Sequence, residues 1–77
     1  MTITQFRNSK EYKEAINKIK AYSIGFTFTL KYEKIPVGKC NALRIITNDC
    51  INIGILESIS IGLDIQGNIT DETYKRI

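Results

Sequence analysis

The stretch INIGILESISIGLDIQGNI, residues 51–69, constrains the fold more than any other part of the chain. Its large aliphatic residues fall on alternate positions with mostly small or polar residues between them, which is typical of β-structure with one buried face. Fully extended, the stretch would run to roughly 50 Å, which is too long for one strand of a small domain. We therefore expect a bend, at Gly54, at a bulge or tight turn over 56–58, or at Gly62. The odd positions are predicted to fill the interior of a bent sheet: Ile51, Ile53, Ile55, Ile59, Ile61, Leu63, Ile65 and Ile69.

A helix is predicted ahead of this stretch, over residues 8–22. Asn8 can cap its first turn, and Glu11, three residues later, can complete a capping box. Apolar residues then recur at helical spacing, at Tyr12, Ala15, Ile16, Ile19 and Tyr22. We expect this stripe to be buried, which leaves the helical lysines on the outer side.

Residues 24–35, IGFTFTLKYEKI, alternate between apolar and polar side chains and are predicted to form a strand. Its aromatic pair, Phe26 and Phe28, is expected to face the core under the helix rather than to stack nucleic-acid bases. Pro36 and Gly38 then indicate a turn. Residues 40–49 are predicted as a second strand, joined to the isoleucine-rich stretch by a two-residue or a three-residue loop. The longer loop gathers the apolar side chains on one face and is preferred.

The end of the chain allows two interpretations. A hairpin turn is predicted at Gly67 and Asn68, after which residues 69–77 form either a return strand or a terminal helical turn. We expect the strand, with Thr73 facing inward. The chain is then a single α+β domain, residues 1–77, with an N-terminal helix and four or five antiparallel strands. It forms either a strongly bent barrel, which resembles small SH3-like or Sm-like barrels in architecture only, or an open sheet with the helix on one face.

The residue inventory argues against catalysis. The chain has no histidine, which removes the commonest general base and metal ligand. Its two cysteines are too few for a zinc site or a disulfide framework. We therefore predict no enzymatic activity and no catalytic, cofactor-binding or metal-binding residues. No signal peptide and no apolar run of roughly 20 residues is recognisable, so a cytoplasmic location, no membrane contact and free thiols are expected.

Charge is unevenly distributed along the sequence. Residues 1–44 contain nine Lys or Arg against three acidic residues, whereas residues 45–77 contain two against five. A basic surface of this kind can bind an anionic partner, although lysines also serve simply to keep a surface solvated. The candidate surface for a partner protein or a nucleic acid consists of Arg7, Lys10, Lys13, Lys20, Lys31, Lys34 and Arg44.

A short chain without a catalytic inventory is expected to act through its surface. We predict a small non-enzymatic protein-binding module that inhibits or regulates a larger host protein or nucleoprotein complex, as small accessory and anti-defence proteins of phages and mobile elements do. Residues 40–49 or the tail strand are expected to offer a free edge for strand addition. The alternative is an RNA- or DNA-binding protein that uses the basic helix and the first strand. A homo-oligomer formed through free strand edges is compatible with both.

Overall fold

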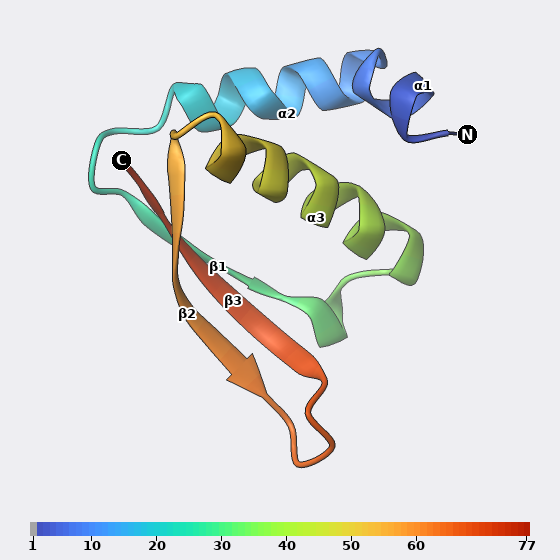
Figure 1. The fold of residues 1–77 in the computed structure, drawn as a ribbon, viewed down its shortest axis with the longest axis vertical. Coiled ribbons are helices and arrows are strands. Elements are labelled where there is room, and N and C mark those ends of the chain that lie inside the picture. The colour runs from blue at the N-terminus through green and yellow to red at the C-terminus, as the bar shows by residue number, and fades with distance from the viewer. Residues whose placement is uncertain (1) are drawn as a thin grey trace.

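The computed structural model describes residues 2–77, and Figure 1 shows helices packed over one face of a three-stranded antiparallel sheet. The elements in chain order are α1 (Ile3–Arg7), α2 (Lys10–Lys20), β1 (Thr27–Lys31), the 3-10 helix η1 (Tyr32–Lys34), α3 (Val37–Asn52), β2 (Leu56–Leu63) and β3 (Ile69–Arg76). The predicted α+β class is confirmed. The sheet is open, with three strands in place of the predicted four or five, so the barrel alternative is wrong. Within residues 2–77, no helix is both long and apolar enough to cross a bilayer.

The predicted N-terminal helix is present as α2. Ser9 is its N-cap, and the Ser9 hydroxyl accepts a hydrogen bond from the N–H of Tyr12 at 3.2 Å. The predicted capping box at Asn8 is wrong, because Asn8 ends a separate short helix, α1, whose own capping box joins Thr2 and Gln5. The apolar stripe of α2 is confirmed: Ile19 is buried, and Tyr12, Ala15, Ile16 and Tyr22 pack against the core.

β1 confirms the alternation of the first predicted strand, although it is shorter than expected. Phe28 and Leu30 are half-buried and pack against the core, while Thr27, Thr29 and Lys31 are exposed. The predicted burial of the aromatic pair thus holds for Phe28 and is wrong for Phe26, which precedes β1 and is 44% exposed.

The strand predicted over residues 40–49 is wrong, because these residues belong to α3. In a strand, the adjacent Ile45 and Ile46 would point to opposite faces, whereas neighbouring residues of a helix can share one broad apolar face. α3 buries Ile46 and Cys50, which are four residues apart, and Ile45 packs beside them. A helix can therefore turn both Ile45 and Ile46 toward the core, whereas a strand could bury only one of them.

The turn predicted at residues 35–39 is the start of the same helix. Pro36 is the N-cap of α3, at a point where the N–H group that proline lacks has no helical partner to bond. Its carbonyl accepts from the N–H groups of Lys39 and Cys40, at 2.9 and 3.0 Å. A proline that was expected to separate two strands instead introduces the longest helix.

The isoleucine-rich stretch is divided between a helix and a strand. The prediction that its odd positions line the core holds for Ile51 and Ile55, which pack against the core, and is wrong for the exposed positions. Ile51 lies in the last turn of α3, and Gly54, with φ of +81°, leads the chain out of the helix. Leu56, the residue that breaks the alternation, is only 1% exposed and is the residue of β2 that enters the core. The odd positions beyond it are exposed: Ile59, Ile61, Leu63 and Ile65.

The tail is the return strand that the sequence predicts, and it lies in the middle of the sheet, in the order β1-β3-β2. Tyr74 of β3 is opposite Phe28 of β1 and Ser58 of β2, so these three residues point to the helical side. Thr73, predicted to face inward, lies on the other face, where its hydroxyl is 2.9 Å from that of Thr29. The prediction is therefore wrong by one residue: Tyr74, rather than Thr73, faces the core.

β1 and β2 are the edge strands, because each pairs only with β3. The predicted edges, residues 40–49 and the tail, are both wrong, since the first is helical and the second is central. Pairing of β2 with β3 shifts register between Ser58 and Ser60, which leaves Ile59 as an extra residue, and again between Gly62 and Leu63. Irregularities were predicted close to both places.

The core lies under the helices, and the hairpin that joins β2 and β3 projects beyond them (Figure 1). The buried residues of the core are Phe6, Ile19, Ile46, Cys50, Leu56 and Tyr74. The Tyr74 hydroxyl donates to Oγ1 of Thr47 at 3.3 Å, and Thr47 donates to the Leu43 carbonyl at 3.0 Å. Burial raises the pKa of Tyr74, so the hydroxyl stays protonated and serves as a donor inside the core.

Candidate protein-binding surface

The seven predicted basic residues do not form one continuous surface. Arg7 is held at 2.9 Å by a carboxylate of α3, and Lys10 lies 3.7 Å from Glu14. The guanidinium of Arg44 lies over the ring of Tyr32, 5.8 Å from its centre. These three cations are therefore partly committed to contacts within the chain.

The other four lie at two separate places. Lys13 and Lys20 line the same hollow between α2 and α3, and neither takes part in the two ion pairs found among residues 2–77. Lys31 ends β1, where it is opposite Asp71, and Lys34 lies in η1. Only Lys13 and Lys20 are brought together as the prediction requires.

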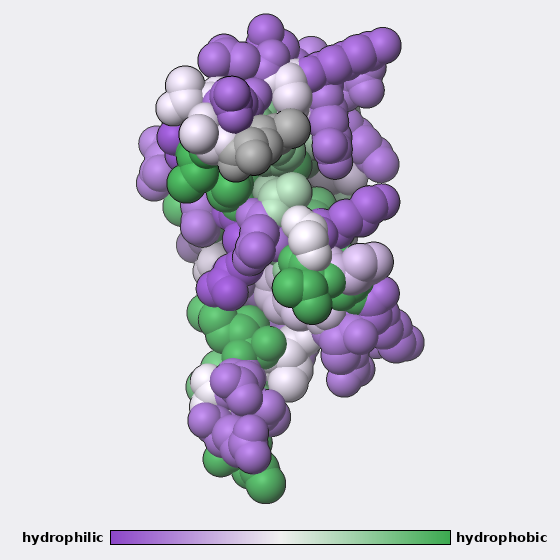
Figure 2. Space-filling model, turned by 90° about the vertical axis from the view of Figure 1, so that its right-hand side faces the viewer, coloured by the Kyte–Doolittle hydropathy of each residue, from purple (hydrophilic) through white to green (hydrophobic). Residues whose placement is uncertain are grey.

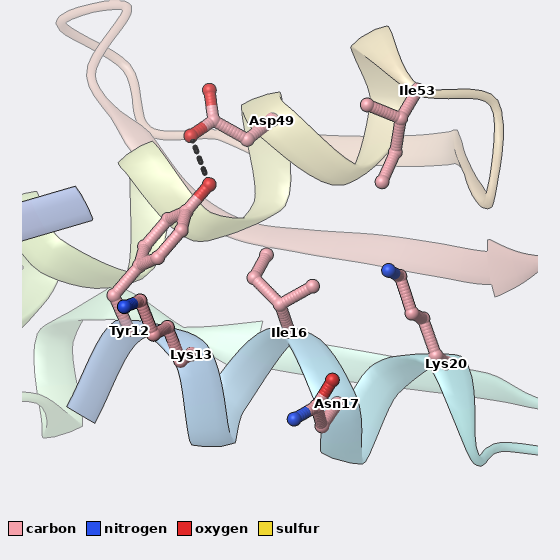
Figure 3. Close-up of a pocket in the computed structure, with 7 residues that line it drawn as sticks. All are labelled: Tyr12, Lys13, Ile16, Asn17, Lys20, Asp49 and Ile53. Carbon is pink, nitrogen blue, oxygen red and sulfur yellow. Dashed lines mark hydrogen bonds between the residues drawn. The ribbon is translucent and has the colours of Figure 1, made fainter. Parts of the chain in front are cut away.

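The hollow between α2 and α3 has a volume of about 370 Å³, and Figure 3 shows the side chains around it. Ile16 of α2 and Ile53 at the end of α3 point toward each other across it. Tyr12 closes one end, where its hydroxyl donates to Asp49 at 2.6 Å. The result is a shallow apolar floor with lysines on the α2 side.

Asp49 joins the three helices. Its carboxylate accepts two hydrogen bonds from Arg7, each 2.9 Å long, as well as the one from Tyr12. The bonds from Arg7 hold the pKa of Asp49 below its ordinary value, and the bond to Asp49 raises the pKa of Tyr12. Both shifts favour a charged aspartate held between two donors, which is the arrangement of a structural clamp.

The thiols give no sign of activation. Both lie on α3 and form no disulfide: Cys50 is fully buried, and Cys40 lies 3.5 Å from the Ile35 carbonyl. Burial raises the pKa of Cys50, which favours the unreactive thiol form. Within residues 2–77, no three His, Cys, Asp or Glu side chains are grouped so as to hold a metal ion.

The most distinctive surface is the hairpin of β2 and β3. Ile59, Ile61 and Leu63 are 48%, 54% and 62% exposed, and Ile65 at the tip is fully exposed. Figure 2 shows the hairpin as a protrusion with green apolar atoms along it and at its tip. Four large aliphatic side chains are thus gathered on one projecting edge of the molecule. We call these four residues the hairpin row.

Acidic residues border the hairpin row. They are Glu57, Asp64, Asp71 and Glu72, and no Lys or Arg lies between residues 45 and 74. Three of these carboxylates accept local hydrogen bonds: Glu72 from the Ser58 hydroxyl and Asp71 from the Thr70 hydroxyl, both at 2.9 Å, and Asp64 from backbone N–H groups of the turn. The hairpin therefore presents apolar side chains in a negative surrounding.

The tip of the hairpin is fixed by its turn. The Asp64 carboxylate accepts from the backbone N–H groups of Asn68 and Gln66, both at 2.9 Å, and the bond from Asn68 is the main reason why the pKa of Asp64 is lowered. Gly67 has φ of +84°, as a turn residue of this kind requires. The hairpin turn predicted at Gly67 and Asn68 is confirmed.

Sequence reasoning missed the hairpin row as a surface because it assigned these residues to the core. A signal was nevertheless present. The residues that alternate with the row, Ser58, Ser60 and Gly62, are small, and the acidic residues gather on this segment without any basic ones. The segment therefore combines one apolar face with an acidic border, whereas the apolar stripe of α2 is bordered by lysines.

No known protein family matches this chain, and no curated protein and no solved structure is detectably similar to it.

Proposed function

We propose that this chain is a non-enzymatic protein-binding module that inhibits or regulates a larger protein or nucleoprotein complex by docking its β2–β3 hairpin. The observation that carries the proposal is the hairpin row, four exposed aliphatic side chains on a projecting edge of the sheet. Exposed apolar groups gathered in this way are characteristic of interaction sites. Burial of one such side chain contributes about 1.5–3 kcal/mol, so the row can supply the energetic centre of an interface of about 800 Å² per partner.

The acidic border specifies the chemistry of the partner. A complementary surface is apolar at its centre and carries Lys or Arg around it. The nucleic-acid-binding surface of a nucleoprotein complex has that positive charge. A small module that covers such a surface inhibits by occupation, which agrees with the role of a phage or mobile-element accessory protein.

Direct nucleic-acid binding is the second candidate, and one observation favours it. Lys13 and Lys20 line the same hollow and have no acidic partner among residues 2–77, so both are free to contact phosphates. Base stacking on Phe28 is not favoured, because this ring packs between Tyr22 and Tyr74 at ring distances of 5.6 and 5.5 Å. Phe26 is 44% exposed, with its ring centre 4.7 Å from that of Tyr22. This mode predicts binding that weakens steeply with salt.

The two candidates are separated by one set of variants in the native host. Tagged wild-type chain, the hairpin variant Ile61→Glu with Leu63→Glu, and the control Ile24→Glu are each used for affinity capture followed by mass spectrometry. Ile24 is 74% exposed and lies outside the hairpin, so the control introduces the same charge on a different surface. We expect a protein that the wild type and the control retain and that the hairpin variant loses.

The captured protein is then purified and titrated with the same three chains. An affinity at least 100-fold weaker for the hairpin variant is expected, since about 3 kcal/mol of apolar burial is lost. Equal binding of the hairpin variant and the control would refute the proposal. Recovery of nucleic acid alone, with binding lost in Lys13→Glu and Lys20→Glu, would instead establish the second candidate.

A further inference from the structure

The open edge of β1 lies beside an apolar cleft, on the side of the sheet away from the hairpin edge β2. The N–H of Arg76 donates to the carbonyl of Phe26 at 2.8 Å, so the even-numbered residues of β1 direct their backbone groups toward β3. By alternation, the N–H and C=O groups of Thr27, Thr29 and Lys31 point to the open side. These groups are available to an added strand.

The cleft lies between α2, β1 and α3 and has a volume of about 250 Å³. Its walls continue outward from the core: Ile19 and Ile46 are buried, and Phe28 and Leu30 are half-buried. This volume is below the roughly 300–1,000 Å³ of clefts that enclose a drug-sized ligand. The cleft therefore suits one apolar side chain of a longer segment better than a free small molecule.

The charged side chain that lines the cleft is positive. It belongs to Lys18, which is exposed and takes part in neither of the ion pairs found among residues 2–77. Lys31 does not add to this charge, because by alternation it points to the other face of the sheet, where it is opposite Asp71. A carboxylate that approaches Lys18 therefore meets an opposite charge.

We propose that β1 and this cleft bind an extended segment of a partner protein in which an apolar residue alternates with acidic ones. The segment adds to β1 as a fourth strand, its apolar side chain enters the cleft, and a carboxylate two residues away, on the same face, pairs with Lys18. Because this site lies on the opposite edge of the sheet from the hairpin, it is a second site that does not depend on the proposed function.

A second copy of this chain is the competing occupant, since its β2 carries Ile61 and Glu57. The register shift at Ile59 interrupts β2, and a bulge of this kind hinders regular pairing with another strand. A segment of a different protein, free of such a bulge, fits β1 better.

The test uses a defined probe, a seven-residue peptide with a central leucine, glutamates two residues to either side and threonine elsewhere. It is titrated to about 10 mM into the ¹⁵N-labelled chain, and backbone amide shifts are recorded by NMR. We expect saturable shifts at Thr27, Thr29 and Lys31 with a Kd of roughly 0.1–1 mM. A peptide with asparagine in place of leucine should not saturate.

Two matched variants test the charge contact. Lys18→Glu should weaken binding of the peptide at least tenfold, and a peptide with lysines in place of the glutamates should recover binding to this variant. Lys13→Glu makes the same change on the same helix but outside the cleft, and it should alter the Kd less than twofold. The hairpin variant with Ile61→Glu and Leu63→Glu should bind the peptide like the wild type, so failure of one site is distinguishable from failure of the other.

Three outcomes would overturn the proposal. The first is the absence of saturable shifts in β1 at about 10 mM peptide. The second is an equal loss of affinity in Lys18→Glu and Lys13→Glu, which would mark a general charge effect. The third is the appearance of the same β1 shifts on concentrating the chain alone, together with a doubled mass in sedimentation, which would assign the cleft to a second copy.

Discussion

A leucine lies at each end of β2, one in the core and the other on the surface. Leu56, the first residue of the strand, is 1% exposed, whereas Leu63, the last, is 62% exposed. Both leucines pair with the same neighbouring strand, β3, so strand propensity does not separate them. The difference lies in the helical layer, which covers one end of the sheet and leaves the hairpin uncovered (Figure 1). Burial here is decided by the neighbouring layer rather than by the strand itself.

The same division appears in the charges. The helical end carries most of the lysines and arginines, and the hairpin end carries acidic residues without any basic ones between positions 45 and 74. The two proposed sites follow this division, with the hairpin suited to a basic surface and the β1 cleft to an acidic segment. A test of one end therefore gives a control for the other.

The comparison is tested most strongly by removing the same side chain at each end of β2. Leu56→Ala leaves a cavity in the core and should lower the free energy of unfolding by about 2–5 kcal/mol. A domain of this size has only a few kcal/mol of net stability, so the variant should be largely unfolded at 25 °C. Leu63→Ala removes an exposed side chain and should change the free energy of unfolding by less than about 0.5 kcal/mol.

Urea denaturation followed by circular dichroism measures both variants. If Leu56→Ala is too unstable to give a folded baseline, Leu56→Val reports the same site with a smaller loss, about 0.5–1.5 kcal/mol. Equal losses for Leu56→Ala and Leu63→Ala would show that the hairpin belongs to the core, and the division of the molecule would fail.

These roles explain how far the sequence predicts the fold. The α2 stripe, the alternation of β1 and the hairpin turn at Gly67 are local patterns, and each is confirmed. Residues 40–49 are ambiguous because a short apolar run suits a helix as well as a strand. Pro36, ahead of them, indicates a turn, although proline also suits the start of a helix.

The surface was less predictable than the fold. Whether Ile61 is core or surface depends on where α3 ends relative to β2. The alternation inside residues 51–69 does not contain that information, and the acidic residues of the segment are only an indirect sign of it. The basic residues were identified correctly as cations, but their contacts are tertiary: Arg7 meets Asp49 of α3 across 42 positions of sequence. A pattern in one sequence predicts which side chains share a face of a helix or strand. A binding site is formed where the faces of several helices and strands meet, and the pattern does not predict that.

A second prediction compares a hydroxyl–carboxylate bond at each end. Tyr12 donates to Asp49 at 2.6 Å in a partly buried clamp, and Ser58 donates to Glu72 at 2.9 Å on the exposed hairpin. Tyr12→Phe should lower the free energy of unfolding by about 1–2 kcal/mol, because a donor to a charged group is lost where water is partly excluded. Ser58→Ala should cost less than about 0.5 kcal/mol, since water replaces the hydroxyl.

The pH dependence gives an independent reading of the clamp. The folded-state pKa of Asp49 is depressed, chiefly by its hydrogen bonds from Arg7, below the ordinary value of 3.8. The charged Asp49 carboxylate therefore contributes its full share to the free energy of unfolding above that value, and this share is lost as the pH falls through the folded-state pKa. The difference in unfolding free energy between wild type and Asp49→Asn should be constant above about pH 5 and should shrink in more acidic solution. A difference independent of pH down to 2 would contradict the clamp.

The smallest expected effect compares two glycines with positive φ. Gly25 has φ of +90° in the exposed turn between α2 and β1, and its N–H donates to the Arg76 carbonyl at 2.7 Å. Gly67 has φ of +84° in the hairpin turn. An added Cβ meets no atom within 4 Å at either site, so an alanine substitution measures backbone strain alone, roughly 1 kcal/mol. Gly25→Ala should lower the free energy of unfolding by that amount, because the hydrogen bond from Gly25 to Arg76 ties this turn to the central strand β3.

Gly67→Ala introduces the same backbone strain, but we expect this strain to open the hairpin locally rather than to lower global stability. The hairpin end has no helical cover, so it can open locally without unfolding the core. We expect the free energy of unfolding to fall by less than about 0.5 kcal/mol. Hydrogen exchange at the amides of Gln66 and Asn68 should become roughly fivefold faster, because the hydrogen bonds that these amides donate to the Asp64 carboxylate open more often. Gly25→Ala should leave the exchange of these two amides unchanged under native conditions. If Gly67→Ala instead shifts the urea midpoint as far as Gly25→Ala does, the hairpin unfolds together with the core. The rigid tip that the docking proposal requires would then be fixed by the whole fold rather than by its turn alone.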